Sequence, residues 1–277
     1  MSSAPSAPSE SSGCPAPGAN RHEALDAPAL RALLAQREQQ LAEQSAALQA
    51  WTHAVSHDLR APLRHITSFG PLVRELLQDA PGLDAATRQE ALDFLATMDQ
   101  SARRMGRMFD GLLQLARIAR APFTPQTVDL GALVREVRTL LAPGCAGRTV
   151  HWQVPNVWPP VHGDAEFLRT LLTELLGNAV KFTRGRDPAQ ITVDGEHGAD
   201  GRFTLRVQDN GVGFDPARAQ ALFGIFQRLH RESEFDGVGC GLAAVRAIAQ
   251  RHGGTVSAQA APGAGCTVSV CWPAAVL

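Results

Sequence analysis

The sequence predicts an α+β fold, in which a dimeric helical hairpin (a four-helix bundle in the dimer) precedes an α/β sandwich domain. Two long stretches before residue 120 carry apolar residues at the spacing of an amphipathic helix. A proline-containing stretch at residues 121–125 separates them from the rest of the chain. Beyond it, apolar runs of strand length are interspersed with helical patterns, which is typical of helices packed on one side of a sheet.

The composition of the 277 residues narrows the class of protein. The chain is 44% hydrophobic and 19% charged, which is ordinary for globular domains. A net charge of -1 gives no electrostatic footprint for nucleic acid, and no apolar stretch approaches the ~20 residues of a membrane helix. Five scattered cysteines without a CxxC pair indicate reduced thiols, and no secretory signal is visible. We therefore expect a cytoplasmic protein with neither nucleic-acid binding nor membrane insertion.

Two segments precede the hairpin. Residues 1–22 are rich in Ser, Pro, Ala and Gly and predict a disordered tail. Within residues 23–50, Leu34, Leu41 and Leu48 lie seven residues apart, the spacing of a coiled-coil seam. The alternative is a single amphipathic helix on a globular core. Because no strand-rich segment precedes it to supply such a core, we favour a coiled-coil signalling helix.

Residues 51–120 predict the hairpin. Its first helix continues to about Leu77, with bends expected at Pro62 and Pro71. A polar turn follows at residues 79–82, and then comes a second helix with one apolar face, formed by Leu92, Leu95, Met98, Ala102, Met105, Phe109, Leu112 and Leu115. A single hairpin exposes this stripe, whereas two hairpins around a two-fold axis bury it. We therefore expect a homodimer.

Residues 126–274 predict the second domain. Helices are expected at residues 130–141, 164–182 and 241–251, and strands at residues 149–154, 191–193, 203–207, 255–258 and 267–271. This mixture predicts helices on one side of an antiparallel or mixed sheet.

Four short motifs occur in a fixed order. They are SHDLRAPL at residues 56–63, ELLGNAVKF at 174–182, DNGVGF at 209–214, and GVGCGL at 237–242, the last preceded by FGIFQR at 223–228. Together they resemble the phosphoacceptor box, Asn box, Gly boxes and Phe box of sensor histidine kinases. The hairpin and residues 227–231 are similar to those of kinases linked to phytochrome or PAS sensors. The resemblance covers about residues 45–272. It implies an ATP-binding catalytic domain at 126–274, the cofactors ATP and Mg²⁺, and a response-regulator receiver domain as a partner.

His57 is the predicted phosphoacceptor. An imidazole on a solvent-facing helix presents a neutral Nε2 nucleophile near pH 7. By the resemblance, Asp58 accepts a hydrogen bond from Nδ1–H and fixes the tautomer. A lone histidine is more often an ordinary surface residue, but the downstream motifs favour the acceptor role. His53 and His65 share its helical face, yet no carboxylate offers an obvious third ligand, so we prefer solvated side chains to a metal site.

The second motif predicts the metal and phosphate contacts. Glu174 and Asn178 are four residues apart and therefore share a helical face. By the resemblance, the Asn178 amide oxygen ligates Mg²⁺, and Glu174 holds a metal-bound water or assists proton removal. Lys181, one turn further on, reaches the phosphates as a point charge.

The glycine motifs predict the base and phosphate cradle. By the resemblance, Asp209 reads the adenine amino group, while Gly211 and Gly213 let the backbone approach the base. Gly237, Gly239 and Gly241 open a helix that starts near Leu242, and helix N-termini bind phosphate. A dinucleotide-binding fold is rejected, because the stretch before these glycines is polar rather than a strand.

The loop at residues 223–236 is the predicted mobile lid over ATP, with Arg228 as a triphosphate contact. Cys240 is expected to pack as a small hydrophobe. The predicted mechanism is a swing of the catalytic domain on residues 121–125, which brings the γ-phosphoryl to His57 in cis or in trans. Many kinases of the family that the motifs resemble carry Thr or Asn four residues after the acceptor, where the side chain positions water to dephosphorylate the partner. Here the position is Ala61, which has no hydrogen-bonding side chain, so we predict weak phosphatase activity toward the response regulator.

The source of the signal and an alternative function remain open from the sequence. The stretch before residue 50 is too short for a sensory domain, so either a separate sensor protein delivers the signal or the chain is a fragment. The nucleotide motifs alone also fit anti-sigma serine kinases, chaperone ATPases and topoisomerase ATPase domains, which the His57 box disfavours. A catalytically inactive dimeric scaffold that binds nucleotide is the alternative function.

Overall fold

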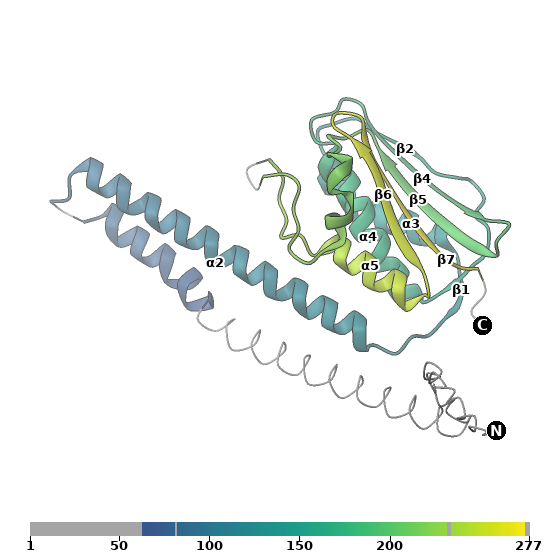
Figure 1. Ribbon diagram of the computed structural model, residues 1–277. Coiled ribbons are helices and arrows are strands. Elements are labelled where there is room, and N and C mark those ends of the chain that lie inside the picture. Colours follow the sequence, from purple (N-terminus) through teal and green to yellow (C-terminus); the bar gives the residue numbers. More distant parts are fainter. Residues whose placement is uncertain (1–62, 81, 232–233, 275–277) are drawn as a thin grey trace, which may run out of the picture. The chain divides into compact units, whose positions relative to one another are not determined.

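The computed structural model of the protein (Figure 1) describes residues 63–80, 82–231 and 234–274. The predicted tail at 1–22, the predicted coiled coil at 23–50, and the acceptor-box residues His57, Asp58 and Ala61 lie outside the described residues.

The hairpin prediction is confirmed in its described part. Residues 63–78 are helical without interruption at Pro71. The second helix, α2, spans Ala85–Arg120, and the Asp84 carboxylate caps it by accepting hydrogen bonds from the N–H groups of Ala86 and Thr87 at 3.0 Å each. Large apolar side chains remain exposed on both helices, namely Ile66, Phe69, Leu72, Val73, Leu76, Phe94, Met98 and Met105.

The second domain is built on a five-stranded mixed sheet with the order β2-β4-β5-β7-β6. β2 and β4 are parallel and the other neighbours are antiparallel. The strands are β2 (Val150–Gln153), β4 (Ala189–His197), β5 (Arg202–Asp209), β6 (Thr255–Ala261) and β7 (Gly265–Pro273). A separate pair joins β1 (Gln126–Val128) to β3 (Val161–Gly163).

Helices cover one face of this sheet, as Figure 1 shows. They are α3 (Leu130–Leu141), α4 (Ala165–Phe182) and α5 (Gly241–Arg251), and two 3-10 helices, η1 (Ala142–Cys145) and η2 (Pro216–Phe223), connect the layers. The predicted α+β class, its three helices and its five main strands are therefore confirmed. The short pair β1–β3 was not predicted, because three-residue strands are too short to show an alternating pattern.

The core lies between the sheet and the helices. Phe203, Leu205 and Val207 alternate along β5 on its buried face, where they meet apolar side chains of α4 such as Leu172 and Leu176. The same alternation places the next residue of that face, at the end of β5, among buried groups. That residue is Asp209, a carboxylate on the buried face of the sheet.

No helix within the described ranges is both long enough and apolar enough to cross a membrane.

Candidate active site

A cavity of about 420 Å³ opens at the end of β5 and gathers most of the predicted site residues. It is bordered by α4, by the loop that leads into α5, and by α2. Ten predicted residues line it: Glu174, Asn178, Lys181, Asp209, Gly213, Arg228, Gly237, Gly239, Gly241 and Leu242. Gly211 is absent from the lining, and His57 and Asp58 lie outside the described residues.

Asp209 is the buried carboxylate of the cavity. It continues the inward face of β5, and Cys266 of β7 lies directly opposite it in the sheet. Burial raises the pKa of Asp209 to about 6, against the lowering effect of hydrogen bonds from the backbone N–H groups of Gly211 and Cys266. At pH 7 the Asp209 carboxyl group is mostly an anion that accepts hydrogen bonds, and the backbone N–H groups of Gly211 and Cys266 hold it in place. This is the chemistry needed to receive an exocyclic amine.

Gly211 and Gly213 shape the wall beside Asp209. Gly213 has a φ of +61°, and a β-carbon there would overlap the carbonyl oxygen of Ala261. A β-carbon on Gly211 would lie 2.6 Å from the carbonyl oxygen of Phe182, at the end of α4. Gly211 therefore brings the loop onto α4 rather than lining the cavity, and Gly213 forms the lining itself.

Glu174 and Lys181 of α4 present opposite charges to the cavity. Burial raises the pKa of Glu174, and a hydrogen bond from the Gln114 amide at 3.5 Å and the charge of Lys181 oppose that shift. Burial likewise lowers the pKa of Lys181, while the charge of Glu174 opposes it. The charge of each group only partly offsets the cost of burying the other. A ligand that brings a cation to Glu174 and an anion to Lys181 would therefore stabilise both charges.

The donors in the cavity fit a magnesium ion that arrives with a polyphosphate. Asn178 and Glu174 offer hard oxygen ligands, and Lys181 offers a cation for phosphate. Within the described residues, no group of three or more His, Cys, Asp or Glu side chains could hold a metal ion by itself. Mg²⁺ is usually bound through one or two protein ligands together with substrate phosphates, and this sparse donor set matches that pattern.

The loop before α5 forms a cradle of backbone groups. Gly239 has a φ of +78°, and a β-carbon there would lie 2.5 Å from the carbonyl oxygen of Gln227. A β-carbon on Gly237 would lie 3.5 Å from Lys181 Nζ, so the glycine loop and the lysine share one end of the cavity. α5 begins at Gly241 without a side-chain cap, which leaves the first N–H groups of the helix for a ligand.

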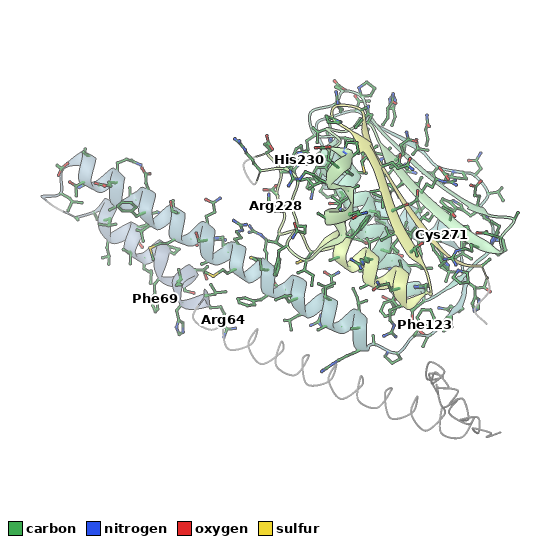
Figure 2. All side chains as sticks on the ribbon, in the orientation of Figure 1. Arg64, Phe69, Phe123, Arg228, His230 and Cys271 are labelled. Atoms are coloured by element: carbon green, nitrogen blue, oxygen red, sulfur yellow. The ribbon has the colours of Figure 1, made fainter. Side chains whose placement is uncertain are left out.

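The predicted lid packs on the end of α4. The rings of Phe182, His230 and Phe235 form a cluster with centroids 5.0 to 5.5 Å apart. Arg228 Nη2 donates to the carbonyl oxygen of Phe235 at 2.7 Å, and Figure 2 shows Arg228 and His230 on this loop. The loop is therefore tied to the end of α4 beside the cavity. Its mobility and the triphosphate contact of Arg228 stay predictions.

Sequence reasoning missed the contribution of α2 to the cavity. Arg107, Asp110, Gly111 and Gln114 all line it. Gly111 lies against Cys240, since a β-carbon on Gly111 would lie 2.5 Å from the sulfur of Cys240. Cys240 is buried, as predicted for a small apolar side chain. A glycine in the middle of a helix was the available signal, because it usually has a packing reason.

Comparison with known families divides the chain into the same two parts. Residues 47–121 match the family described as "His Kinase A (phospho-acceptor) domain". Residues 163–276 match the family described as "Histidine kinase-, DNA gyrase B-, and HSP90-like ATPase". The first match covers the hairpin and the acceptor box, and the second covers the residues that line most of the cavity.

Individual proteins that are similar to this chain are histidine kinases or phytochrome-like proteins. The chain is 30% identical to the methanogenesis regulatory histidine kinase FilI of Methanothrix harundinacea, over 85% of this chain and 26% of FilI. It is 29% identical to the phytochrome-like protein Cph1 of Synechocystis, over 84% of this chain and 30% of Cph1. The chain thus spans between about a quarter and a third of these relatives. The adaptive-response sensory kinase SasA of Synechococcus is 31% identical over 84% of this chain and 61% of SasA.

Solved structures show the same architecture. Full-length ShkA in complex with AMPPNP matches 82% of this chain and 46% of the ShkA chain, with a TM-score of 0.57 and 25% identity. The Acinetobacter baumannii histidine kinase AdeS shares the fold, with a TM-score of 0.53 at 16% identity over 79% of this chain and 98% of the AdeS chain. With an acceptor hairpin followed by an ATPase domain whose cavity holds the expected side chains, the chain belongs to the sensor histidine kinase family.

Proposed function

We propose that the protein is an ATP-dependent protein-histidine kinase of a two-component system. It phosphorylates His57 and passes the phosphoryl group to an aspartate of a response-regulator receiver domain. The observation that carries this proposal is the cavity that unites Asp209, Asn178 and the glycine loop, in a chain whose hairpin contains the acceptor box.

The cavity would bind the adenine base of ATP at one end and its phosphates at the other. At the buried end, the Asp209 carboxylate accepts a hydrogen bond from the adenine amino group, which a guanine base does not offer in the same place. At the other end, Lys181 and the backbone between Gly237 and Gly241 receive the phosphates. Asn178, with Glu174 through a water, would hold Mg²⁺, which neutralises charge on the phosphate oxygens. Catalysis then consists mainly of positioning and charge stabilisation.

Two transfers follow. The neutral Nε2 of His57 attacks the γ-phosphorus, a P–N bond forms, and the bond from that phosphorus to the bridging oxygen breaks, releasing ADP. Asp58 accepts a hydrogen bond from Nδ1–H and keeps the attacking nitrogen unprotonated. In the second transfer, a receiver-domain carboxylate attacks the same phosphorus, and the P–N bond breaks.

Labelling with ATP that carries a radioactive γ-phosphate tests the proposal. The wild-type protein should acquire an acid-labile, base-stable label that His57→Gln abolishes, whereas His65→Gln, eight residues further along the sequence, retains it. Asn178→Asp should also abolish labelling without lowering the melting temperature, because it changes a ligand in the cavity and not the core. Nucleotide binding without any label in the wild type would favour the inactive scaffold.

A weak phosphatase activity is part of the proposal. Ala61 lacks a hydrogen-bonding side chain to position water against the phosphorylated partner. Adding the protein with ADP to a phosphorylated receiver domain should leave its dephosphorylation rate within about twofold of the spontaneous rate. Ala61→Thr is the matched variant and should accelerate it. Rapid loss of label with the wild type would contradict this part of the proposal.

We further propose that the protein forms a homodimer through its hairpin. The exposed apolar stripe of the hairpin, including Phe69, Phe94 and Met98, is the surface that a second copy would cover in a four-helix bundle. A separate sensor protein that acts through residues 23–50 stays a prediction.

A further inference from the structure

A polar and aromatic cluster, of which only Asp164 and His252 are buried, joins residues 119–124 to the catalytic domain. It lies at the end of α5 opposite to the glycine loop of the cavity. We call it the linker clamp and define it by Phe123, Thr124, Asp164, Arg251 and His252. None of these five residues lines the nucleotide cavity. The cluster therefore needs an explanation other than nucleotide binding.

Arg251, the last residue of α5, caps the end of α2. Its Nη1 and Nη2 donate to the carbonyl oxygens of Ala119 and Ala121, each at 2.6 Å. The last carbonyls of a helix lack partners inside the helix, and a cation is favourable at that end of the helix dipole. The planar guanidinium also lies 5.9 Å from the ring centroid of Phe123. One side chain of the catalytic domain thus holds both the helix end and the start of the linker.

Phe123 inserts from the linker into an aromatic group of the catalytic domain. Its ring meets His252 edge-on at 4.8 Å and stacks on Phe167 at 6.3 Å. Figure 2 shows Phe123 beside the end of α5. An aromatic side chain packed in this way fixes the linker by burial as well as by ring geometry.

Asp164 holds the next linker residue. Its Oδ2 accepts hydrogen bonds from both the N–H and the hydroxyl of Thr124, each at 2.9 Å. Its Oδ1 accepts from the N–H groups of Glu166 and Phe167 and so caps α4. Burial raises the pKa of Asp164, but these hydrogen bonds outweigh it and leave the pKa below its ordinary value. A carboxylate that caps α4 is therefore also the anchor of the linker.

His252 completes the cluster in its neutral form. Nε2 accepts a hydrogen bond from the Asp164 N–H at 3.1 Å, so Nδ1 carries the proton and donates to the Ile248 carbonyl oxygen at 2.9 Å. Burial lowers the pKa of His252, while Asp164 and Arg251 act on it in opposite directions. Both ring nitrogens are used, and such a satisfied buried network is costly to disrupt.

We propose that the linker clamp makes residues 119–124 part of the rigid catalytic domain, so that the linker is not the hinge of the kinase. A swing on residues 121–125, as the sequence suggested, would break the two bonds of Arg251 and the two bonds of Thr124. The rearrangement that carries ATP to His57 takes place before residue 119, where α2 meets α5 through Gly111 and Cys240. The contacts of the linker clamp do not depend on the proposed kinase function. The inference rests on that function only where it says that the motion brings ATP to His57.

Hydrogen–deuterium exchange on the full-length protein tests the clamp directly. The peptide that covers residues 119–125 should show equal protection without nucleotide and with AMPPNP, because the junction moves with the domain. Arg251→Ala should speed its exchange about tenfold or more, since two carbonyls and Phe123 lose their partner. The matched control is Arg246→Ala, an exposed arginine on the same helix, which should leave the junction unchanged.

Activity provides the second readout. Arg251→Ala should slow His57 labelling about tenfold while ADP affinity stays within about twofold, because the cavity is intact and only its orientation to the hairpin is lost. Arg251→Lys keeps the charge but not the planar fork, and should fall between Arg251→Ala and the wild type. Melting temperatures identify any variant that fails to fold, and Arg251→Lys then carries the test.

Two results would overturn the clamp. One is wild-type protection at residues 119–125 that disappears when AMPPNP binds. The other is Arg251→Ala exchanging like Arg246→Ala. Both are read from amide exchange, which needs no phosphorylation. A wild-type protein that never labels His57 would therefore refute the proposed function while the clamp is still judged on its own data.

Discussion

Asp209 shows how a single residue acquires its chemistry from its position in a strand. Phe203, Leu205 and Val207 place every second side chain of β5 in the core, and Asp209 follows in the same phase. A buried carboxylate has a raised pKa, here to about 6, and it is kept in place by hydrogen bonds from Gly211 and Cys266. The sequence predicted the residue and its partner group, but its degree of burial is a property of the folded sheet.

Nucleotide binding should therefore depend on pH. An amine donor binds better to the ionised form of Asp209. This form predominates at pH 7 and becomes the minor form as the pH drops below about 6. We expect ADP affinity to weaken about tenfold between pH 7 and pH 5, and calorimetric titration measures it. Asp209→Asn should bind weakly at both pH values and lose this dependence. Equal slopes for the two proteins would show that another group titrates.

At the scale of elements, α2 and α5 meet through a glycine. A side chain at Gly111 would overlap Cys240, so the close approach of the two helices depends on that position. Gln114, one turn along α2, donates a hydrogen bond to Glu174 at 3.5 Å. In this arrangement the middle of α2 lines one side of the cavity. If the proposed phosphorylation of His57 takes place, we expect this part of α2 to move away from α5 first.

A disulfide at this contact should stop the kinase reversibly. A β-carbon on Gly111 lies 2.7 Å from the β-carbon of Cys240, so a shift of about 1 Å gives the ~3.8 Å of a disulfide. Oxidised Gly111→Cys should label His57 at less than about a tenth of its reduced rate, because α2 is held on α5. The pair Gly111→Cys with Cys240→Ser cannot cross-link and is the control. Full activity of the oxidised protein would place the motion elsewhere.

Across the whole molecule, the catalytic domain and the hairpin differ in how much of their apolar surface they bury. The catalytic domain has a continuous core around Leu172, Leu176 and Trp272. The described hairpin instead leaves large side chains exposed, including Phe69, Leu76 and Phe94. An exposed apolar stripe of this kind favours association, and a second copy in the proposed homodimer would cover it.

A charge in the stripe should separate the dimer. Phe94→Lys places an ammonium group in the proposed interface, where it would be buried without a partner. We expect the dimer dissociation constant, measured by sedimentation velocity, to rise about a hundredfold. Gln100→Lys, at an exposed polar position of the same helix, should have little effect. A monomeric wild-type protein, or an intact Phe94→Lys dimer, would contradict the proposed bundle.

Helices and strands were predicted correctly where neighbouring residues in the sequence specify them, and were missed where they depend on a distant partner. α3 and α5 were predicted with the bounds that the structure has, because an amphipathic pattern lies between an Asp129 cap and a turn in one case, and between glycines in the other. β1 and β3 were missed, since each has three residues and exists only through its distant partner. The α2 residues in the cavity were missed for the same reason.

The sequence by itself determined the family and the fold class, and it predicted the candidate site residues, because motifs and helical periodicity are properties of neighbouring residues. Only the tertiary structure decided that ten of those residues share one cavity, that α2 closes it, and that Arg251 and Asp164 hold the linker. Those contacts join residues 40 to 130 positions apart. Long-range contacts of this kind are set by how whole elements pack, which no local pattern encodes.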